Sequence, residues 1–407
     1  MENFFNPDPT SEDRRSDRYG QTRFRLNVVF KPTDYLEVRW RFHAPHGARW
    51  GTGNLTDLRT AYAFARVKTA AGTISAGRIS SDIDSAGLQT LGYSPTWGFS
   101  SQGFIFDSDS EKDAVMYRND WSNGFGLKAF YAKRAHTAPT AAVPAEDVDW
   151  DRFSLEPYYK WDGGGMSVAV QYDNDKRANV VSNYIVSVNP AVTHKFAIGE
   201  KATLALNAEL KYSAGELQSL PDTDSIDQSG FGVYGDLTLG YGTGSMSLAG
   251  WWLGGNDEGA TPDTPKKQNL VGSGQAFYPF LIFNQNLMGA SITPLGGVPS
   301  DDYKTDNSNH WGLALLGNHT INKYVTFNYG LGYFGKVADY YLTPDETVSK
   351  NLGTEVDLGI TAKLMDNITY TTKFGFFFPG DYYNERYKTE NYDGTVWGWA
   401  NEFIFSF

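Results

Sequence analysis

Two groups of charged residues are spaced so that they could act together on a solute by electrostatics. The basic group occurs at every second position of two neighbouring segments, which places it on one face of an extended chain: Arg23, Arg25, Arg39 and Arg41. An acidic group follows in one later segment: Asp82, Asp84, Asp107, Asp109 and Glu111. If the two groups face each other across a narrow aqueous space, the field between them orients dipolar solutes and disfavours apolar ones. The alternative is that the arginines pair with Glu37 and these acids only to hold the structure.

The sequence gives little support for covalent catalysis or a cofactor. It has no Cys, and its 6 His residues lack the carboxylate spacing of a metal site. No Ser, His and Asp arrangement has a supporting context, so an enzyme is not expected. A G-x-G-x-x-G string, Gly330 to Gly335, stands inside an alternating segment, where its glycines are expected to leave space beside a bulky loop. Acidic pairs such as Asp82 with Asp84 could hold calcium, although solvated acidic loops are the ordinary case.

Composition excludes further classes of protein. In 407 residues, 35 basic and 47 acidic side chains give a formal net charge of −12, which argues against a nucleic-acid partner. The 41% of hydrophobic residues argues against disorder. No segment approaches the ~20 consecutive apolar residues of a membrane-spanning helix. Aromatic residues at 15% and 43 Gly stand out in a chain of mean hydropathy −0.43.

The elements that position these residues follow a period of two. Phe24, Leu26, Val28 and Phe30 alternate with polar residues, and a turn signal at Pro32 separates them from the next alternating run. The clearest segments of this kind are 22–31, 36–43, 153–161, 166–173, 204–211, 355–363 and 368–376. They read as amphipathic strands that are joined as hairpins.

The connections alternate between short turns and long polar loops. The long loops are 44–56, 80–112, 135–151, 174–190, 213–228, 255–306, 337–351 and 380–394. Short turns at one end and long loops at the other are typical of a transmembrane antiparallel β-barrel with short periplasmic turns and long extracellular loops. We therefore expect an all-β barrel of about 18 strands, with 16 as the alternative. The count of 18 uses Glu2 to Phe5 as a strand and 6–20 as its external loop.

The end of the chain resembles a known family. Phe403, Phe405 and Phe407 lie on one face of an alternating segment whose last residue is aromatic. This resembles the C-terminal strand of bacterial outer-membrane proteins, in which the terminal Phe is part of the signal for barrel assembly. The basic run 22–43 further resembles the homotrimeric porins of anaerobic Gram-negative bacteria.

That resemblance implies an organisation for the chain. Residues 1–407 form one barrel domain, and the third external loop, 80–112, folds into the pore as its constriction. The loop 255–306 is a long external or pore-lining loop. Its apolar segment, Ala276 to Phe283, is expected inside the barrel, over its mouth or against a neighbouring subunit. Small residues at Ala61, Ala63 and Ala65 suit wall packing or a subunit interface.

The expected function is passive diffusion of small hydrophilic solutes or ions through a water-filled pore. One alternative is a substrate-selective channel for organic acids or other anions, and another is a structural sheath barrel that holds a cell-surface partner. The charge preference stays open, because the arginines favour anions while the net charge favours cations. The protein is expected in the outer membrane, exported with its signal peptide removed, as a homotrimer among membrane lipids and lipopolysaccharide. Neither a resident metal nor another cofactor is expected.

Overall fold

Antiparallel strands make up most of the structure, which is a computed structural model. It describes residues 2–5, 16–19, 25–43, 59–79, 96–97, 100–101, 112–136, 149–175, 182–218, 226–259, 267–268, 280, 309–386 and 395–405. Among these residues, no helix is both long and apolar enough to cross a membrane.

The first half of the chain contains strands β1 (Glu2–Phe5), β2 (Ser16–Tyr19), β3 (Arg25–Phe30), β4 (Leu36–His43), β5 (Arg59–Thr69), β6 (Gly72–Ile79), β7 (Thr96–Trp97), β8 (Ser100–Ser101), β9 (Lys112–Asp120), β10 (Phe125–His136), β11 (Asp149–Trp161), β12 (Gly164–Asp175) and β13 (Ser182–Ile198). The second half contains β14 (Ala202–Gln218), β15 (Ile226–Tyr241), β16 (Gly244–Leu253), β17 (Glu258–Gly259), β18 (Lys267–Gln268), β19 (His310–Asn322), β20 (Val325–Lys336), β21 (Tyr340–Thr343), β22 (Glu346–Thr347), β23 (Asn351–Met365), β24 (Ile368–Pro379), helix α2 (Asp381–Arg386) and β25 (Val396–Phe405).

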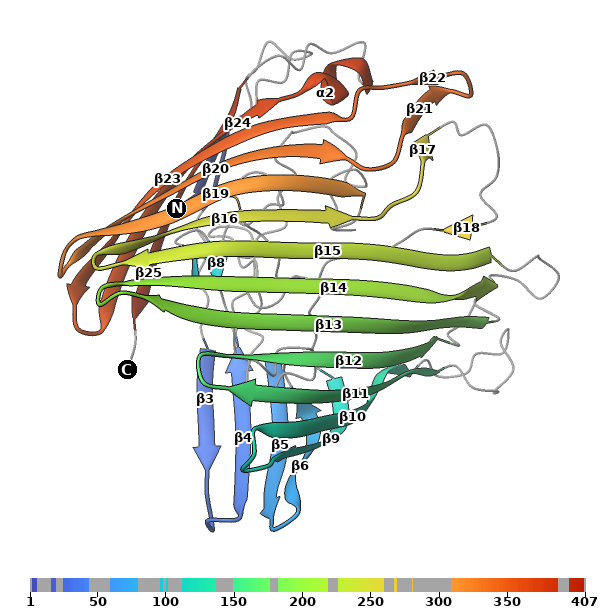
Figure 1. Cartoon of the computed structure of the whole chain (residues 1–407), viewed down its shortest axis with the longest axis vertical. Coiled ribbons are helices and arrows are strands. Elements are labelled where there is room, and N and C mark those ends of the chain that lie inside the picture. The colour runs from blue at the N-terminus through green and yellow to red at the C-terminus, as the bar shows by residue number, and fades with distance from the viewer. Residues whose placement is uncertain are drawn as a thin grey trace.

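The main sheet has 20 strands, and most of them pair with their neighbours in the chain. Antiparallel ladders run without interruption from β3 to β25, and β25 then pairs with β1, where Asn3 lies opposite Trp399. Leaving out β1, β2 and β18 from the 20 gives seventeen long strands, and β1 is the additional strand that the sequence predicts. The short turns all lie along the left and lower border of Figure 1.

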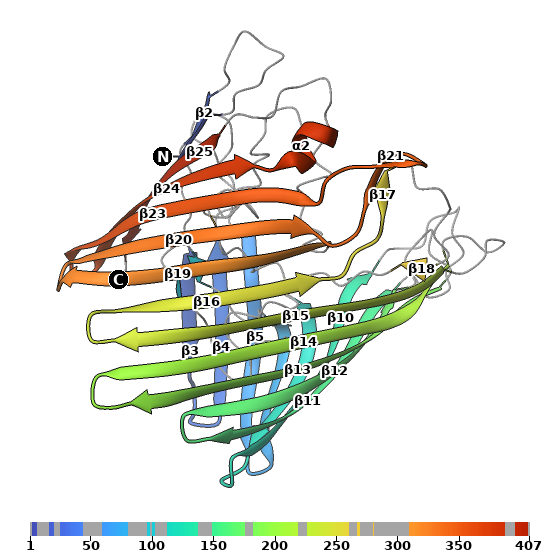
Figure 2. The same ribbon diagram turned by 45° about the horizontal axis from the view of Figure 1, so that its top comes forward.

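The sheet curls round on itself and forms an antiparallel β-barrel. Figure 2 shows β3, β4 and β5 lying behind β13 to β16, so that the sheet encloses an interior. The two ends of the sheet are β2, which pairs with β1, and β3, which pairs with β4. These two strands follow one another in the chain. This arrangement gives backbone donors and acceptors partners within the sheet, as a spanning structure requires in lipid.

The two faces of the wall have the reverse polarity of a soluble protein. On β11, Arg152, Ser154 and Glu156 are buried, whereas Phe153 and Leu155 are 50% and 48% exposed. The same alternation holds on β12, where Gln171 and Asp173 are buried and Val170 is exposed. The apolar face is therefore the outer one, and the polar face lines the interior.

Strand β13 corrects the predicted loop 174–190. The strand begins at Ser182, and Pro190 lies inside it, in register with Val168 of β12. Proline has no backbone N–H, and the ladder with β14 has no pair at this position. The side-chain amide of Asn189 donates to the carbonyl oxygen of Leu210 instead. A neighbouring side chain thus replaces the missing donor, which the proline alone did not indicate.

Other predicted loops also contain regular structure. Residues Ser16–Tyr19 of the predicted loop 6–20 form β2 against β1. The loop 337–351 contains β21 and β22, and β21 pairs with β17 in a small separate sheet. The predicted loop 380–394 begins with α2. These elements are too short to show an alternating pattern, and their polar side chains are typical of loops. Strand pairing uses backbone groups, so polar side chains do not prevent it.

The barrel predicts that charge is tolerated differently at two depths of its outer face. Leu358 lies near the middle of β23 and is 40% exposed, while Leu364 lies near its turn and is 55% exposed. We expect Leu358→Arg to lower the free energy of unfolding by about 2–4 kcal/mol and Leu364→Arg by about 0–1 kcal/mol, because the bilayer centre solvates charge worst. Denaturant unfolding in lipid vesicles measures both, and equal costs would contradict a membrane-spanning β23.

Candidate functional site

Three cations share one carboxylate on the interior wall near the short turns. Glu37 of β4 is 6% exposed, and its carboxylate oxygens lie 3.3 Å from Lys31 Nζ and 3.2 Å from Arg66 Nη1. Arg39 Nε donates to the same carboxylate. Arg66 faces Glu37 directly across the β4–β5 ladder, so the register of the strands sets this contact. Among the described residues, one negative charge here meets three positive ones.

Arg41 stands one inward position further along β4. Its Nε donates to Asn27 Oδ1 at 2.7 Å, and its guanidinium lies 4.7 Å from the centre of the Tyr62 ring. The Tyr62 hydroxyl donates to the same Asn27 oxygen at 2.9 Å. The arginine is held in place by an amide and a ring, and neither group cancels its charge.

The next strands carry a second cluster at the same end. Asp120 Oδ2 lies 2.9 Å from Arg118 Nε, and Asp120 Oδ1 lies 3.8 Å from Lys160 Nζ. The Tyr158 hydroxyl donates to Asp120 Oδ1 at 2.6 Å. Lys160 also lies over the Tyr158 ring, 5.2 Å from its centre. Two cations again share one acid.

Deeper in the wall, cations and acids are matched one to one. Lys128 Nζ of β10 lies 3.0 Å from Glu156 Oε2 of β11, and both side chains are almost fully buried. Arg152 of β11 binds Asp173 of β12 through two bonds, Nε to Oδ1 at 2.6 Å and Nη2 to Oδ2 at 2.8 Å. A buried charge is costly without such a partner, so these pairs fix the side chains of neighbouring strands.

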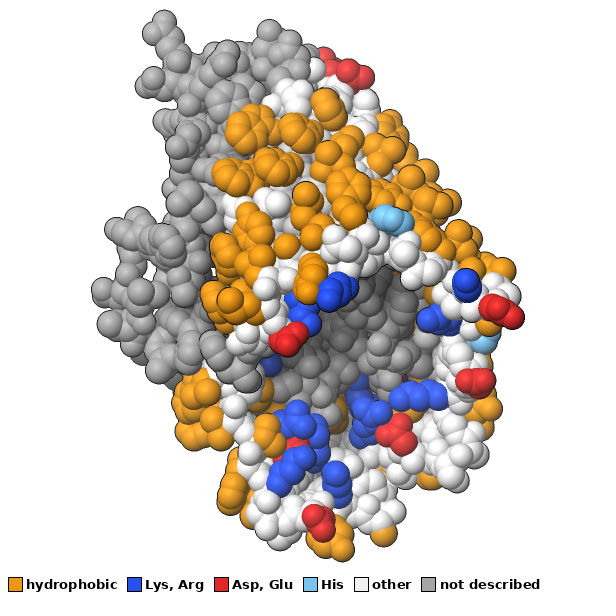
Figure 3. All heavy atoms as spheres, turned by 90° about the vertical axis from the view of Figure 1, so that its left-hand side faces the viewer, with side chains coloured by type: hydrophobic (Ala, Val, Ile, Leu, Met, Phe, Trp, Pro, Cys, Tyr) orange, Lys and Arg blue, Asp and Glu red, His pale blue; other side chains and the backbone are white. Residues whose placement is uncertain are grey.

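These inward cations form a basic arc that runs from β4 to β11. Its members are Arg39, Arg41, Arg66, Arg118, Lys128, Arg152 and Lys160. Figure 3 looks onto the short-turn end and shows Lys and Arg side chains gathered around an opening, with hydrophobic side chains over the outer surface above it.

A different part of the wall, which we call the acidic wall, carries buried acids. They point inward from β14, β15 and β23: Glu209, Asp236, Glu355 and Asp357. Asp236 accepts hydrogen bonds from Asn207 at 2.9 Å, Tyr234 at 3.0 Å and Thr238 at 3.0 Å. These three donors are neutral, so they stabilise the carboxylate without cancelling its charge. Lys373 on the neighbouring strand β24 is buried as well, so this part of the wall carries both acids and a cation.

An apolar patch also faces the interior, where segment 80–112 leaves and rejoins the wall. Ile79 ends β6 immediately before that segment, and Ala114 follows it on β9. The inner apolar patch consists of Tyr62, Phe64, Ile79, Ala114, Met116, Phe130 and Ala132, all buried. An apolar surface of this size is unfavourable against water, so the patch suits a covering segment.

Phe280 of the long loop 255–306 lies inside the barrel. Its ring is fully buried and packs edge-on against Phe334 of β20, with centres 5.1 Å apart. A side chain at Gly332 would place its Cβ 2.5 Å from the Phe280 ring, and one at Gly330 would place it 3.3 Å away. Gly330 and Gly332 of the G-x-G-x-x-G string therefore make room for Phe280, as the sequence predicts for a bulky loop, whereas Gly335 lies beside Trp311. The rest of the segment 276–283 lies outside the described residues.

The structure describes only some of the residues that the sequence singles out. Arg39 and Arg41 point inward from β4, and Arg25 belongs to β3 opposite His43. Arg23 and the acids Asp82, Asp84, Asp107, Asp109 and Glu111 lie outside the described residues. Phe403 and Phe405 are exposed on β25, while Phe407 lies outside the described part. Within that part, no group of three or more His, Asp or Glu residues is placed to hold a metal ion.

The sequence singled out neither the remaining members of the basic arc nor the acidic wall. Arg66, Arg118 and Lys128 occupy inward positions of strands, as do Glu209 and Asp236. Strand parity was the available signal, because each lies an even number of residues from an inward neighbour. Their pairing across strands depends on register, which alternation alone leaves open.

The Phe280 contact generates a stability prediction. We expect Phe280→Ala to lower the free energy of unfolding by about 3–5 kcal/mol, as for other buried Phe residues. Phe376→Ala on the outer face of β24 serves as the control and should cost less, because lipid replaces the lost contacts. Gly332→Leu should be destabilising in the wild type and less so beside Phe280→Ala, since loss of the Phe280 ring relieves one of two close approaches and leaves the one to Phe334. Additive effects in a double-mutant unfolding cycle would contradict the contact.

Comparisons with known proteins support the fold. No family model matches the chain, and no curated protein matches it. Among solved structures, the chain is similar to OpdQ of Pseudomonas aeruginosa, with 11% identity, a TM-score of 0.53, and 99% of this chain and 94% of that one covered. It is also similar to OccK8 (OprE) of the same organism, with 11% identity, a TM-score of 0.51, and coverage of 99% and 97%. At this identity the likeness shows the fold alone, which is that of a bacterial outer-membrane β-barrel.

Proposed function

We propose that the protein is an outer-membrane pore for the passive diffusion of small hydrophilic solutes or ions. The observation that carries the proposal is the reversed polarity of the wall, with charged side chains inside and apolar ones outside. Charged side chains such as Arg39 and Arg66 need water or a counter-charge, and a water-filled interior provides water and dissolved ions. A barrel with this interior conducts solutes whose size and charge fit its narrowest part.

The proposal assigns the constriction to segment 80–112. The inner apolar patch lies where this segment leaves and rejoins the wall, and the apolar residues of the segment, such as Leu88, Tyr93 and Trp97, suit that patch. Anchored there, its acids Asp82, Asp84, Asp107, Asp109 and Glu111 would stand within the field of the basic arc. Phe280 is supporting evidence that loop residues enter the barrel.

A second candidate function is a substrate-selective channel for organic acids or other anions. The excess positive charge around Glu37 favours this candidate, since three cations share that single carboxylate. A carboxylate solute passing the basic arc could bind there while its other groups face the acidic wall. Such a solute would be held in one orientation by the two opposite charges.

The proposal includes a location and partners. The apolar outer face suits membrane lipids and lipopolysaccharide, and the exposed Phe403 and Phe405 of β25 suit the assembly signal of outer-membrane proteins. We propose a homotrimer in the outer membrane of a Gram-negative bacterium, with neither enzymatic activity nor a resident cofactor. Ala63 and Ala65, which alternate with the buried Tyr62 and Phe64 on β5, support close packing at the outer wall.

Conductance tests the pore directly. The full chain, reconstituted into a planar lipid bilayer, should give stepwise ohmic current increments, grouped in threes if the protein is a trimer. Block of the current by an added organic acid, but not by a neutral sugar of similar size, would favour the selective channel. Folded protein that inserts into the bilayer and gives no steps would exclude both pore functions.

Charge reversal tests the basic arc. We expect Arg39→Glu and Arg41→Glu each to lower the anion-to-cation permeability ratio by roughly two- to fivefold, which corresponds to ~0.4–1 kcal/mol for an ion in the pore. Glu37→Gln should shift the ratio toward anions, because it removes one negative charge from the cluster. Reversal potentials across a salt gradient measure all three.

The matched control is Lys323→Glu, which makes the same change in the short turn between β19 and β20, away from the clusters. It should leave the reversal potential close to that of the wild type. If the arginine variants and this control shift it equally, the permeating ions do not pass the basic arc.

A further inference from the structure

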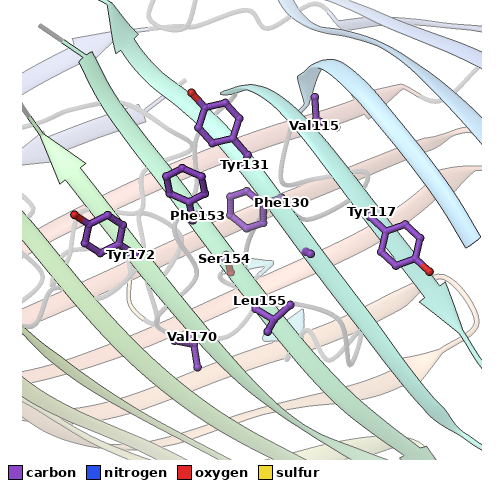
Figure 4. Close-up of a pocket in the computed structure, with 10 residues that line it drawn as sticks. Val115, Tyr117, Phe130, Tyr131, Phe153, Ser154, Leu155, Val170 and Tyr172 are labelled. Atoms are coloured by element: carbon purple, nitrogen blue, oxygen red, sulfur yellow. The ribbon is translucent and has the colours of Figure 1, made fainter. Parts of the chain in front are cut away.

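A groove of about 520 Å³ runs over the outer face of β9 to β12. Figure 4 shows Tyr117 at one end of the groove and Tyr131, Phe153 and Tyr172 at the other. Outward side chains between them complete the lining, including Ala129, Leu155 and Val170. These residues are on the side of the wall opposite to the basic arc, so the groove belongs to a surface that the pore does not use.

The groove exists because one outward position is small. In the cross-strand row Tyr117, Ala129, Leu155 and Val170, Ala129 has the shortest side chain. The Tyr117 hydroxyl donates to the Ala71 carbonyl oxygen in the β5–β6 turn. This hydrogen bond holds the Tyr117 ring away from Ala129. In the next row, Tyr131 and Phe153 pack with ring centres 4.9 Å apart and close the other end. A narrow apolar slot remains, open to the side.

A row of outward charges borders the aromatic end of the groove. Arg78 of β6 lies opposite Asp113 of β9, Asp113 opposite Lys133 of β10, and Lys133 opposite Asp151 of β11. Asp151 accepts a hydrogen bond from Tyr131 at 2.8 Å. Each charge is two residues beyond an outward apolar side chain, toward the long-loop end of its strand. This is the depth at which a barrel meets lipid headgroups on the loop side.

We propose that this groove binds one acyl chain of a phosphorylated, multiply acylated lipid of the outer leaflet, with the lipid phosphate at Arg78 and Lys133. The slot takes a flexible hydrocarbon chain because its lining is apolar and Ala129 forms its floor. Arg78 and Lys133 offer charge-assisted donors to a phosphate at the level of the headgroups. Asp113 lies between the two cations in the register and Asp151 lies opposite Lys133, so the row carries two cations and two acids. The inference rests on the proposed location in an outer membrane.

A second copy of the chain fits this surface less well. A flat interface would press the charged row against a neighbouring wall and remove it from water, which is costly for charges without new partners. It would also leave the slot at Ala129 empty unless a complementary ridge filled it. A lipid satisfies both parts at once, since its headgroup is polar and its chain is apolar.

Native mass spectrometry of the full chain in detergent tests the proposal, with bis-phosphorylated lipid A as the probe. We expect one lipid A retained per chain in the wild type and at least about tenfold weaker retention for Ala129→Trp, which fills the floor of the groove. Leu248→Trp is the matched control on the outer face of β16, where the residue is 59% exposed, and should leave retention unchanged. If Ala129→Trp fails to fold, as judged by its heat-modifiable gel mobility, Ala129→Leu replaces it.

The phosphate contact is tested with Arg78→Gln and Lys133→Gln. Each should weaken retention of bis-phosphorylated lipid A severalfold and leave dephosphorylated lipid A unaffected, whereas Lys323→Gln should change neither. The proposal is overturned if Ala129→Trp and Leu248→Trp act equally, if phosphatidylglycerol is retained as well as lipid A, or if dimers sensitive to Ala129→Trp appear in place of the lipid adduct. Conductance of the same samples keeps the two proposals apart. Normal steps with no retained lipid overturn only the lipid site, and retained lipid without steps overturns only the pore.

Discussion

Backbone hydrogen bonding is the constraint on which the rest of the structure depends. A sheet in lipid has no water for its N–H and C=O groups, so every strand needs two neighbours and the sheet must curl until its ends meet. The chain meets most of this requirement with a meander from β3 to β25 that continues through β1 to β2, the strand that precedes β3 in the chain. Once the wall is fixed in this way, each side chain has one of two environments, and its parity along the strand decides which. Leu155 and Glu156 are neighbours in sequence and face opposite solvents.

The same constraint shapes the electrostatics of the interior. Register places Arg66 opposite Glu37 and Lys128 near Glu156, and each of these contacts joins two adjacent strands. On β10 to β12, the deep cations Lys128 and Arg152 each face one acid, because an unmatched buried charge is costly. Near the short turns, where water reaches the wall, Glu37 and Asp120 are each shared by more than one cation. In the described part of the wall, cations therefore outnumber acids in these two clusters, at the end where water lowers the cost of a charge.

The sequence predicts the fold well and the site only in part. The fold follows from local patterns, whereas the site depends on contacts between strands. Alternation and the contrast between short turns and long loops depend on local residues, and they indicated the barrel, the strand count and the role of Glu2 to Phe5. Pro190 was misread as a loop residue because the compensating bond from Asn189 crosses to Leu210 on another strand. Arg39 and Arg41 were found because they are close in sequence, whereas the contact of Arg66 with Glu37 depends on a register that alternation does not set. Phe280 was expected near the interior as one of several alternatives, and only packing against Gly332 places it there.

The effect of a small residue depends on the face of the wall that it occupies. Gly330 and Gly332 are inward, and the space they leave is filled by the chain itself through Phe280. Ala129 is outward, where no described part of the chain fills the space it leaves, and the groove stays open. A void beside packed side chains loses dispersion contacts, so an outward void gains from any apolar molecule that fits it. Lipid chains are the apolar molecules present at that surface of a membrane protein. In the two proposals, the inner face of the wall thus binds solutes and the outer face binds lipids. A substitution at an inward position should affect the solutes alone, and one at an outward position the lipids alone.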